Sequence, residues 1–455
     1  MAELSEVRGG RLGRRSWTAL TLIWVVAVAG CTSAESDGPV TAPAVTQSEG
    51  EGIADSTATA EPLPGVLWSI DGALVAGSNC AAPVTGQPLR IGYAADFGLI
   101  GADADIAGNE AVRHLAKLIN CSGGVEGQPV EIVVADVGGR PVTAMEATEE
   151  LLGMDPHAII GPRLASSGLR LLQATGGRVP VVFATSTEPA LADPSKASYL
   201  VGVDGAAAGR VAARFSIDQG WLTAATLTAP GPDFGYGPRS FAATFEAEGG
   251  TDIADIPFAV GGTEPFEEIL DDLASGSPPD VIFSVMPKVR FAQLVGEARA
   301  AGIESAFING DPFALAGLTP MPVDPGPTSS TGSAPLDPVD DRPAELAADL
   351  AGTYAVAQPI DTPGSRIRRL DESFRAATGS GSQNPAAAAL AGDALTAIIE
   401  AYLCGGKGSP EATAQALSGN LVVDGVTGVF TYGGRGAPAR PINIAQLVDD
   451  EVVSV

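Results

Sequence analysis

The sequence predicts an α/β protein with two similar lobes, each built around a parallel central sheet. From residue 88 onward, short apolar runs alternate with longer stretches of helical periodicity. The alternation starts again after residues 199–203, which indicates a second set of β-α-β units. The length of 455 residues also exceeds that of an ordinary single domain, which favours two lobes over one.

The first set of elements begins with an apolar run at 89–93, which predicts a strand, and a helix at about 105–119. Gly123 and Gly124 follow this helix, where glycine tolerates the left-handed backbone of a helix end. The other expected elements are strands at 130–135, 158–161 and 181–184, and helices at 142–152 and 167–175. Continuous apolar strands joined by helices are typical of a parallel sheet covered on both faces.

The second set repeats this pattern. It comprises expected helices at 206–219, 238–247, 266–274 and 290–301, and strands at 224–227, 253–258, 280–285 and 306–308. Residues 317–342 are rich in Pro, Ser, Thr, Gly and Asp, which predicts a disordered insertion. The remainder is expected to form a strand near 353–358, helices near 366–377 and 386–404, and strands at 428–432, 442–447 and 452–455.

The N-terminal residues 1–30 are typical of an export signal. A basic region precedes an apolar run at 17–29 that is too short to span a bilayer comfortably. The basic residues are Arg8, Arg11, Arg14 and Arg15. The run ends in Val28-Ala29-Gly30-Cys31, which resembles the bacterial lipobox and implies cleavage before Cys31 and lipidation of its thiol. A plain signal peptide or membrane anchor is the alternative, and the Arg14-Arg15 pair partly matches a twin-arginine signal.

Residues 31–85 are assigned to the lipidated Cys31 and a flexible tether, because residues 32–66 have almost no large apolar side chains to offset chain entropy. No later segment is expected to cross a membrane. These features place the protein outside the cytoplasm, lipid-anchored to the outer face of the cell membrane.

Composition argues against several functional classes. A formal net charge of −28 disfavours nucleic acid as a partner, since phosphate binding needs a positive surface. His114 and His157 are the only histidines, and their predicted positions disfavour a Ser-His-Asp arrangement or a His-based metal site. Carboxylates are numerous enough for a two-acid glycosidase, but no pair stands out in the strand-end loops. We therefore expect a monomer without enzymatic activity, cofactor or metal.

Five segments, in order, resemble the type I periplasmic binding proteins, particularly the leucine/isoleucine/valine-binding branch. The resemblance runs from about residue 88 to the C-terminus, apart from 317–342. The segments are 119–127 (Ile-Asn-Cys-Ser-Gly-Gly-Val-Glu-Gly), 159–162 followed by Ser166-Ser167, 181–191, 233–237 (Asp-Phe-Gly-Tyr-Gly) and 425–428 (Gly-Val-Thr-Gly).

This resemblance implies two Rossmann-like lobes joined by a three-segment hinge, with a ligand held in the cleft between them. The N-terminal lobe would comprise 86–203 plus 360–428, and the C-terminal lobe 204–359 plus 440–455. Such a protein captures a small polar molecule, such as an amino acid or amide, by hinge closure and delivers it to the permease of an ABC importer. A ligand-sensing receptor of the same fold, or a surface scaffold that binds nothing, remains an alternative.

The resemblance also implies ligand-binding residues, which are Ser166, Ser167, Thr185, Thr187, Phe234, Tyr236 and Asp311. Asp311 falls where the family carries an acid paired with an amino group, which favours an amine-bearing ligand. The alternatives are helix capping for the serines, turn formation for the threonines and Asp311, and core packing for Phe234.

The chain departs from the amino-acid binders where these place aromatic residues around the ligand. Gly101, Met286-Pro287 and Ala387 stand at those positions, so a branched-chain amino acid is not assumed.

Export makes a disulfide plausible among the remaining cysteines. Cys80 precedes the first expected strand and Cys121 ends the following helix, so the two are expected to lie close together and to form a disulfide. Cys404, at another helix end, competes for either partner, and one thiol is left over.

Overall fold

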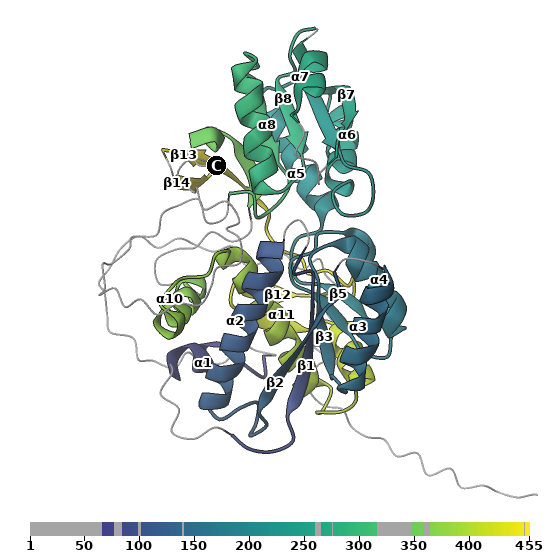
Figure 1. The fold of residues 1–455 in the computed structure, drawn as a ribbon, viewed down its shortest axis with the longest axis vertical. Coiled ribbons are helices and arrows are strands. Elements are labelled where there is room, and N and C mark those ends of the chain that lie inside the picture. Colours follow the sequence, from purple (N-terminus) through teal and green to yellow (C-terminus); the bar gives the residue numbers. More distant parts are fainter. Residues whose placement is uncertain are drawn as a thin grey trace, which may run out of the picture.

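The computed structural model describes residues 66–76, 84–98, 102–138, 141–259, 265–274, 276–315, 348–357, 365–449 and 451–455. The export signal, Cys31, Cys80, Gly101 and the 317–342 insertion lie outside these residues. Within them, the chain forms two lobes, one above the other in Figure 1, each with its own sheet. The prediction of a two-lobed α/β fold is therefore confirmed.

The N-terminal lobe contains an entirely parallel sheet of strand order β2-β1-β3-β4-β5. Its strands are β1 (Leu89–Ala95), β2 (Val130–Asp136), β3 (Ala158–Gly161), β4 (Val181–Phe183) and β5 (Ser198–Leu200). Neighbouring strand residues point to opposite faces, so Ile160 packs with α2 (Ala102–Cys121) and α11 (Pro385–Cys404), whereas Ile159 packs with α3 (Pro141–Gly153) and α4 (Ala165–Thr175). The shorter elements of this lobe are α1 (Asp71–Ala76), α10 (Arg366–Thr378), α12 (Pro410–Leu417) and the 3-10 helices η1 (Pro189–Leu191) and η2 (Pro194–Lys196).

The C-terminal lobe contains a mixed sheet of order β14-β13-β10-β9-β8-β6-β7. Its parallel strands are β6 (Thr223–Thr228), β7 (Thr251–Pro257), β8 (Val281–Ser284), β9 (Ala306–Asn309) and β10 (Tyr354–Ala357). The last strands, β13 (Asn443–Val448) and β14 (Glu451–Ser454), add antiparallel pairs at one edge. The helices α5 (Gly205–Asp218) and α6 (Tyr236–Ala247) contribute to one core cluster, and α7 (Glu267–Ala274) and α8 (Lys288–Ala300) to another.

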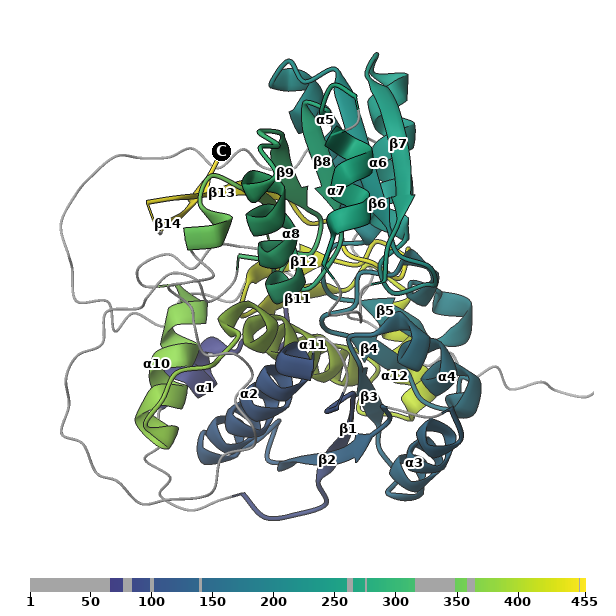
Figure 2. The ribbon, with the colours of Figure 1, turned by 45° about the horizontal axis from the view of Figure 1, so that its top comes forward.

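The chain passes between the two lobes three times. It leaves the N-terminal sheet after β5 and returns after β10. It passes up again between β12 (Gly428–Thr431), which pairs with β11 (Val422–Gly425), and β13. The residues that join β10 to α10 lie outside the described residues, and the strand-end loops of the two sheets face each other (Figure 2).

Helix α11 corrects the expectation that no segment after the export signal could cross a membrane. Its 20 residues are long and apolar enough by length and composition. However, most of them are buried, and α11 forms the centre of the N-terminal lobe's core, where alanines permit close packing against α2 (Figure 2). We interpret it as the core helix of a globular lobe.

The predicted tether over 31–85 is wrong at its C-terminal end. Residues 66–76 pack on the N-terminal lobe, where Ile70 and, in α1, Ala73 and Leu74 are buried in its core. Arg366 forms an ion pair with Asp71, and the Glu400 carboxylate accepts the Leu67 N–H at 2.6 Å. The compositional argument rested on residues 32–66, whereas the apolar residues at 66–76 provide enough buried surface to fix the chain.

Cys121 and Cys404 are both disulfide-bonded. They end α2 and α11, which pack along each other. Because Cys80 lies outside the described residues, the Cys80–Cys121 pairing stays a prediction, and the competing role expected for Cys404 stays open.

Candidate functional site

Four loops meet where the two lobes face each other. The N-terminal lobe contributes residues 162–164 after β3 and 184–188 after β4. The C-terminal lobe contributes residues 229–235 after β6 and 310–315 after β9. All four follow the carboxyl ends of parallel strands, which is where open α/β sheets bind ligands.

One end of this interface is closed by a buried ion pair between the lobes. Arg163 Nη2 donates to Asp311 Oδ2 at 2.6 Å, and the two side chains are only 9% and 3% exposed. The Arg163 guanidinium lies over the ring of Phe313 at 5.3 Å, and Phe313 belongs to the buried core cluster of the opposite lobe. We call Arg163, Asp311 and Phe313 the sealed end of the interface.

Asp311 is fully engaged in this arrangement. Its second carboxylate oxygen, Oδ1, accepts the Phe313 N–H at 3.1 Å. Its own N–H donates to Asn309 Oδ1 at 2.9 Å. The structure thus places the predicted amine partner at the interface, but the guanidinium of Arg163 already occupies it. A ligand amino group would have to displace Arg163.

Asp105 of α2 supports the sealed end from the N-terminal lobe. Its carboxylate accepts the N–H groups of Asp96 at 2.9 Å and Arg163 at 3.0 Å, which fixes the backbone of Arg163. Complete burial raises the pKa of Asp105 to about 8. Burial also raises the pKa of Asp96 to about 6. Carboxyl groups with raised pKa values thus gather beside the interface, as often occurs at functional sites.

The structure separates the roles of Ser166 and Ser167. Helix α4 begins at Ala165 after Leu164, and no side chain of its own caps it. Instead, Asp233 of the other lobe accepts the Ser166 N–H at 2.8 Å, where a negative charge is favoured at a helix N-terminus. Ser167 is fully buried and donates from Oγ to Asp96 Oδ1 at 3.0 Å, within its own lobe. Neither hydroxyl caps the helix, and Ser166 is the serine that faces the second lobe.

Another part of the interface contains a small cavity of about 10 Å³, close to the space that one water molecule needs. Its lining comes from both lobes and includes Thr187, Glu188, Asp233, Phe234 and Tyr236. We call these five residues the cavity end. Thr187 also accepts the Gly205 N–H through its backbone oxygen at 2.6 Å, which ties this loop to the start of α5. A ligand larger than a water molecule requires the lobes to separate.

The two predicted aromatic residues differ in their surroundings. Phe234 lines the cavity and also packs against both core clusters of the C-terminal lobe, so it is both a cavity wall and a core residue. Tyr236 is 40% exposed at the start of α6, and the Arg239 guanidinium lies 4.9 Å from its ring centre. Tyr236 therefore forms the outer edge of the cavity.

Sequence reasoning missed Glu188 and Arg163. Glu188 is only 3% exposed; its Oε1 accepts the Ala190 N–H at 3.0 Å and so caps η1. Its Oε2 is buried and has no hydrogen-bond partner among the described residues. An acid before Pro189 is typical of a turn, and an arginine in a loop is typical of the surface. Neither pattern predicts burial between lobes.

The other predicted positions lie deeper. Thr185 is 3% exposed at the end of β4. Met286 is fully buried, and its N–H donates to Asn309 Oδ1 at 3.3 Å. Ala387 is fully buried in α11. Met286 and Ala387 therefore fill core space, and neither lines the cavity end.

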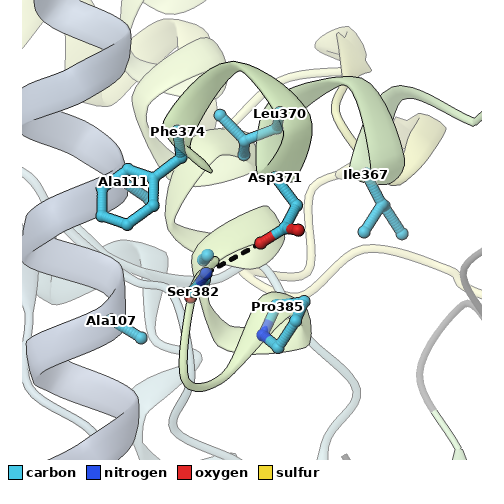
Figure 3. A pocket seen from close by; sticks show the side chains of 9 residues that line it. Ala107, Ala111, Ile367, Leu370, Asp371, Phe374, Ser382 and Pro385 are labelled. Atoms are coloured by element: carbon cyan, nitrogen blue, oxygen red, sulfur yellow. Dashed lines mark hydrogen bonds between the residues drawn. The ribbon is translucent and has the colours of Figure 1, made fainter. Parts of the chain in front are cut away.

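A second small cavity, also about 10 Å³, lies beneath α10 and away from the strand-end loops (Figure 3). It is lined mainly by apolar side chains, including Ile367, Leu370 and Phe374. Its acid, Asp371, accepts the Ser382 N–H at 2.8 Å. We interpret this cavity as a packing defect between helices. In the part of the chain that the structure describes, no group of three or more His, Cys, Asp or Glu residues is arranged to hold a metal ion.

Comparison with known proteins agrees with this architecture. Residues 88–451 match the family model described as periplasmic binding protein. No curated protein matches the chain. Similar solved structures include the leucine-binding protein LivK from Thermotoga maritima, with 18% identity, TM-score 0.66, and coverage of 81% of this chain and 97% of that one.

Two further structures show the range of molecules bound by proteins of this fold. The branched-chain amino acid binding protein LivJ from Streptococcus pneumoniae, solved with isoleucine, has 17% identity, TM-score 0.66, and coverage of 81% and 100%. A solute-binding protein of an ABC transporter from R. palustris, solved with benzoate, has 16% identity, TM-score 0.65, and coverage of 81% and 95%.

Proposed function

Because the chain belongs to the periplasmic binding protein family, we propose that it captures a small polar solute between its lobes and delivers it to the permease of an ABC importer. The observation that carries the proposal is the meeting of four strand-end loops, with charged contacts from Arg163 to Asp311 and from Ser166 to Asp233. A closed interface of this kind supports a hinge that shuts on a solute, and a closed shape that a permease recognises.

The proposed ligand is an amino acid, an amide or a related small compound. Support comes from the isoleucine and benzoate of the similar structures, which are both small carboxylates. The predicted ligand contacts at the cavity end, Thr187, Phe234 and Tyr236, combine a hydroxyl with apolar surface, which suits a ligand with a polar head and a carbon skeleton. The lobes are proposed to part at this end when the solute enters.

A thermal-shift screen of the full-length chain tests the proposal. The panel comprises amino acids, amides, polyamines and small organic acids, including isoleucine and benzoate, each at 10 mM. At least one compound should raise the melting temperature, because a ligand present at 100 times its Kd stabilises the folded state by about 2.7 kcal/mol. Uptake of that compound should then fall in cells that lack the protein. If no compound stabilises the chain, the proposal fails.

The segment Val28-Ala29-Gly30-Cys31, which resembles the bacterial lipobox, supports a proposed lipid anchor on Cys31. In cells labelled with radioactive palmitate, the wild-type chain should carry label and sediment with membranes. The Cys31→Ser variant should carry none and be released. A wild-type chain without label would contradict the lipobox interpretation, and an unlabelled Cys31→Ser chain that still sediments with membranes would favour a plain membrane anchor.

A surface scaffold is the second candidate, because the chain's own residues fill most of the space between the lobes. Arg163 and Phe313 occupy the sealed end, and the cavity end has room for about one water molecule. The scaffold predicts that no compound in the screen binds and that the lobes stay closed under all conditions.

A further inference from the structure

Among the buried carboxylates beside the interface, Asp311 and Glu188 differ in how their oxygens are used; Asp96 Oδ2 also has no partner among the described residues, but Asp96 does not line the cavity. Asp311 Oδ2 accepts a hydrogen bond from Arg163, and Asp311 Oδ1 accepts the Phe313 N–H. Glu188 Oε1 accepts the Ala190 N–H, whereas Glu188 Oε2 is buried and has no partner among the described residues. A buried carboxylate oxygen without a donor is costly, so a structure that keeps one favours a donor that arrives from outside.

The surroundings of Glu188 favour a positively charged donor. Asp233, which also lines the cavity, adds a second negative charge. Burial raises the pKa of Glu188, although the Ala190 N–H and the charge of Arg239 act in the opposite direction. The nearby cation, Arg239, is exposed and lies over the ring of Tyr236. An ammonium group placed at Glu188 would form a charge-assisted hydrogen bond and relieve the repulsion between the two acids.

Resting on the proposed function, we infer that Glu188, and not Asp311, is the carboxylate that binds the amino group of the solute. The solute is then a small primary amine whose carbon skeleton lies against Phe234 and Val285, both of which line the same cavity. Arg163 keeps Asp311 neutralised inside the interface, so the sealed end does not take part in recognising the amine.

Pairs of probes that differ in the amino group test this inference. Isoleucine is compared with 3-methylpentanoate, and benzylamine with benzyl alcohol, by isothermal titration of the full-length chain at pH 7.5. The test variant is Glu188→Gln, which keeps an oxygen to cap η1 and replaces the second oxygen by an amide. The matched control is Asp193→Asn, because Asp193 caps the neighbouring η2 through the Ser195 N–H at 3.1 Å and does not line the cavity.

The expected result is that an amine probe binds the wild-type chain more tightly than its amine-free partner. Its Kd should rise at least about tenfold in Glu188→Gln and stay unchanged in Asp193→Asn, because the charge-assisted hydrogen bond is lost only in the first variant. Circular dichroism of both variants checks that the fold is retained.

Other outcomes separate this inference from the proposed function. Equal binding of the amine probes to the wild-type chain and Glu188→Gln would remove Glu188 from the site but leave solute binding intact. Binding of the amine-free probes alone would overturn the assigned ligand class and would also leave solute binding intact. If no probe bound and the broader screen were also negative, both proposals would fail together.

Discussion

The two ends of the interlobe interface are built from the same kinds of residue and yet differ in completeness. At the sealed end, both oxygens of Asp311 are bonded and the ring of Phe313 is buried in the core of the opposite lobe. At the cavity end, Glu188 keeps an unbonded oxygen and Tyr236 is partly exposed. Hydrogen bonds join the lobes at both ends, from Arg163 to Asp311 at one and from Ser166 to Asp233 at the other, but the carboxylate of Asp311 is fully bonded whereas that of Glu188 is not. The difference teaches that a contact which closes the lobes can be built separately from a group that the proposed function assigns to the solute.

Removal of the Arg163 guanidinium should have the largest effect, because it should open the sealed end. In Arg163→Met, Asp311 would be left as a buried and unpaired carboxylate, which costs about 3–5 kcal/mol. The lobes can avoid that cost by separating and letting water reach Asp311. We therefore expect a larger radius of gyration by small-angle X-ray scattering.

A matched control is Arg214→Met, since Arg214 pairs with Glu248 on the surface, with side chains 63% and 46% exposed. Such a pair contributes about 0–1 kcal/mol, so the scattering curve should not change. The double variant Arg163→Met/Asp311→Leu should close again, because no buried charge remains. A wild-type scattering curve for Arg163→Met alone would show that the ion pair does not hold the lobes.

Replacement of Phe313, whose ring packs in the core of the opposite lobe, should have a somewhat smaller effect on stability. Phe313 is 5% exposed and packs within the core cluster of the opposite lobe, so Phe313→Ala should cost about 3 kcal/mol of the free energy of unfolding. Urea unfolding measures this value. Phe313→Leu keeps an apolar side chain and should lose less than half as much; equal losses would mean that apolar burial alone does not account for the contribution and that the ring's own contacts do.

The elements that could be predicted from the sequence are those fixed by local pattern. The strand at 158–161 is a continuous apolar run and the helix near 386–404 is apolar at most positions, and such local patterns do not depend on partners far away in the chain. Helix α1 was missed because its six residues are too few to show a period. Its stability comes from the core beneath it and from Arg366, which lies 295 positions later.

The candidate site was predictable only in part, for the same reason. Thr187, Phe234 and Tyr236 follow strands, and the topology brings them to one cavity. The pairing of Arg163 with Asp311 joins residues 148 positions apart, and no local pattern encodes it. The assignment of Asp311 to an amine rested on a resemblance, and the structure gives that carboxylate a partner within the chain.

The last effect that we predict concerns pH, and it sharpens the distinction between the interface and the core. The pKa of Asp105 is about 8 in the folded state, against 3.8 as its ordinary value, so between these values the folded chain binds more protons than the unfolded chain. Its contribution to stability is therefore complete below about pH 4 and is lost as the pH rises through about 8. The Asp105→Asn variant, which resembles the protonated acid, should show a flatter decline in the free energy of unfolding between pH 6 and 9.

Glu400, with a pKa raised by burial to about 7, lies in the core of the N-terminal lobe and gives the matched control Glu400→Gln. Both substitutions should flatten the stability curve, but only Asp105→Asn should also remove a pH dependence from the scattering radius, because Asp105 holds the backbone of Arg163 at the sealed end. If both variants left that radius dependent on pH to the same degree as the wild type, protonation of Asp105 would have no part in closing the lobes.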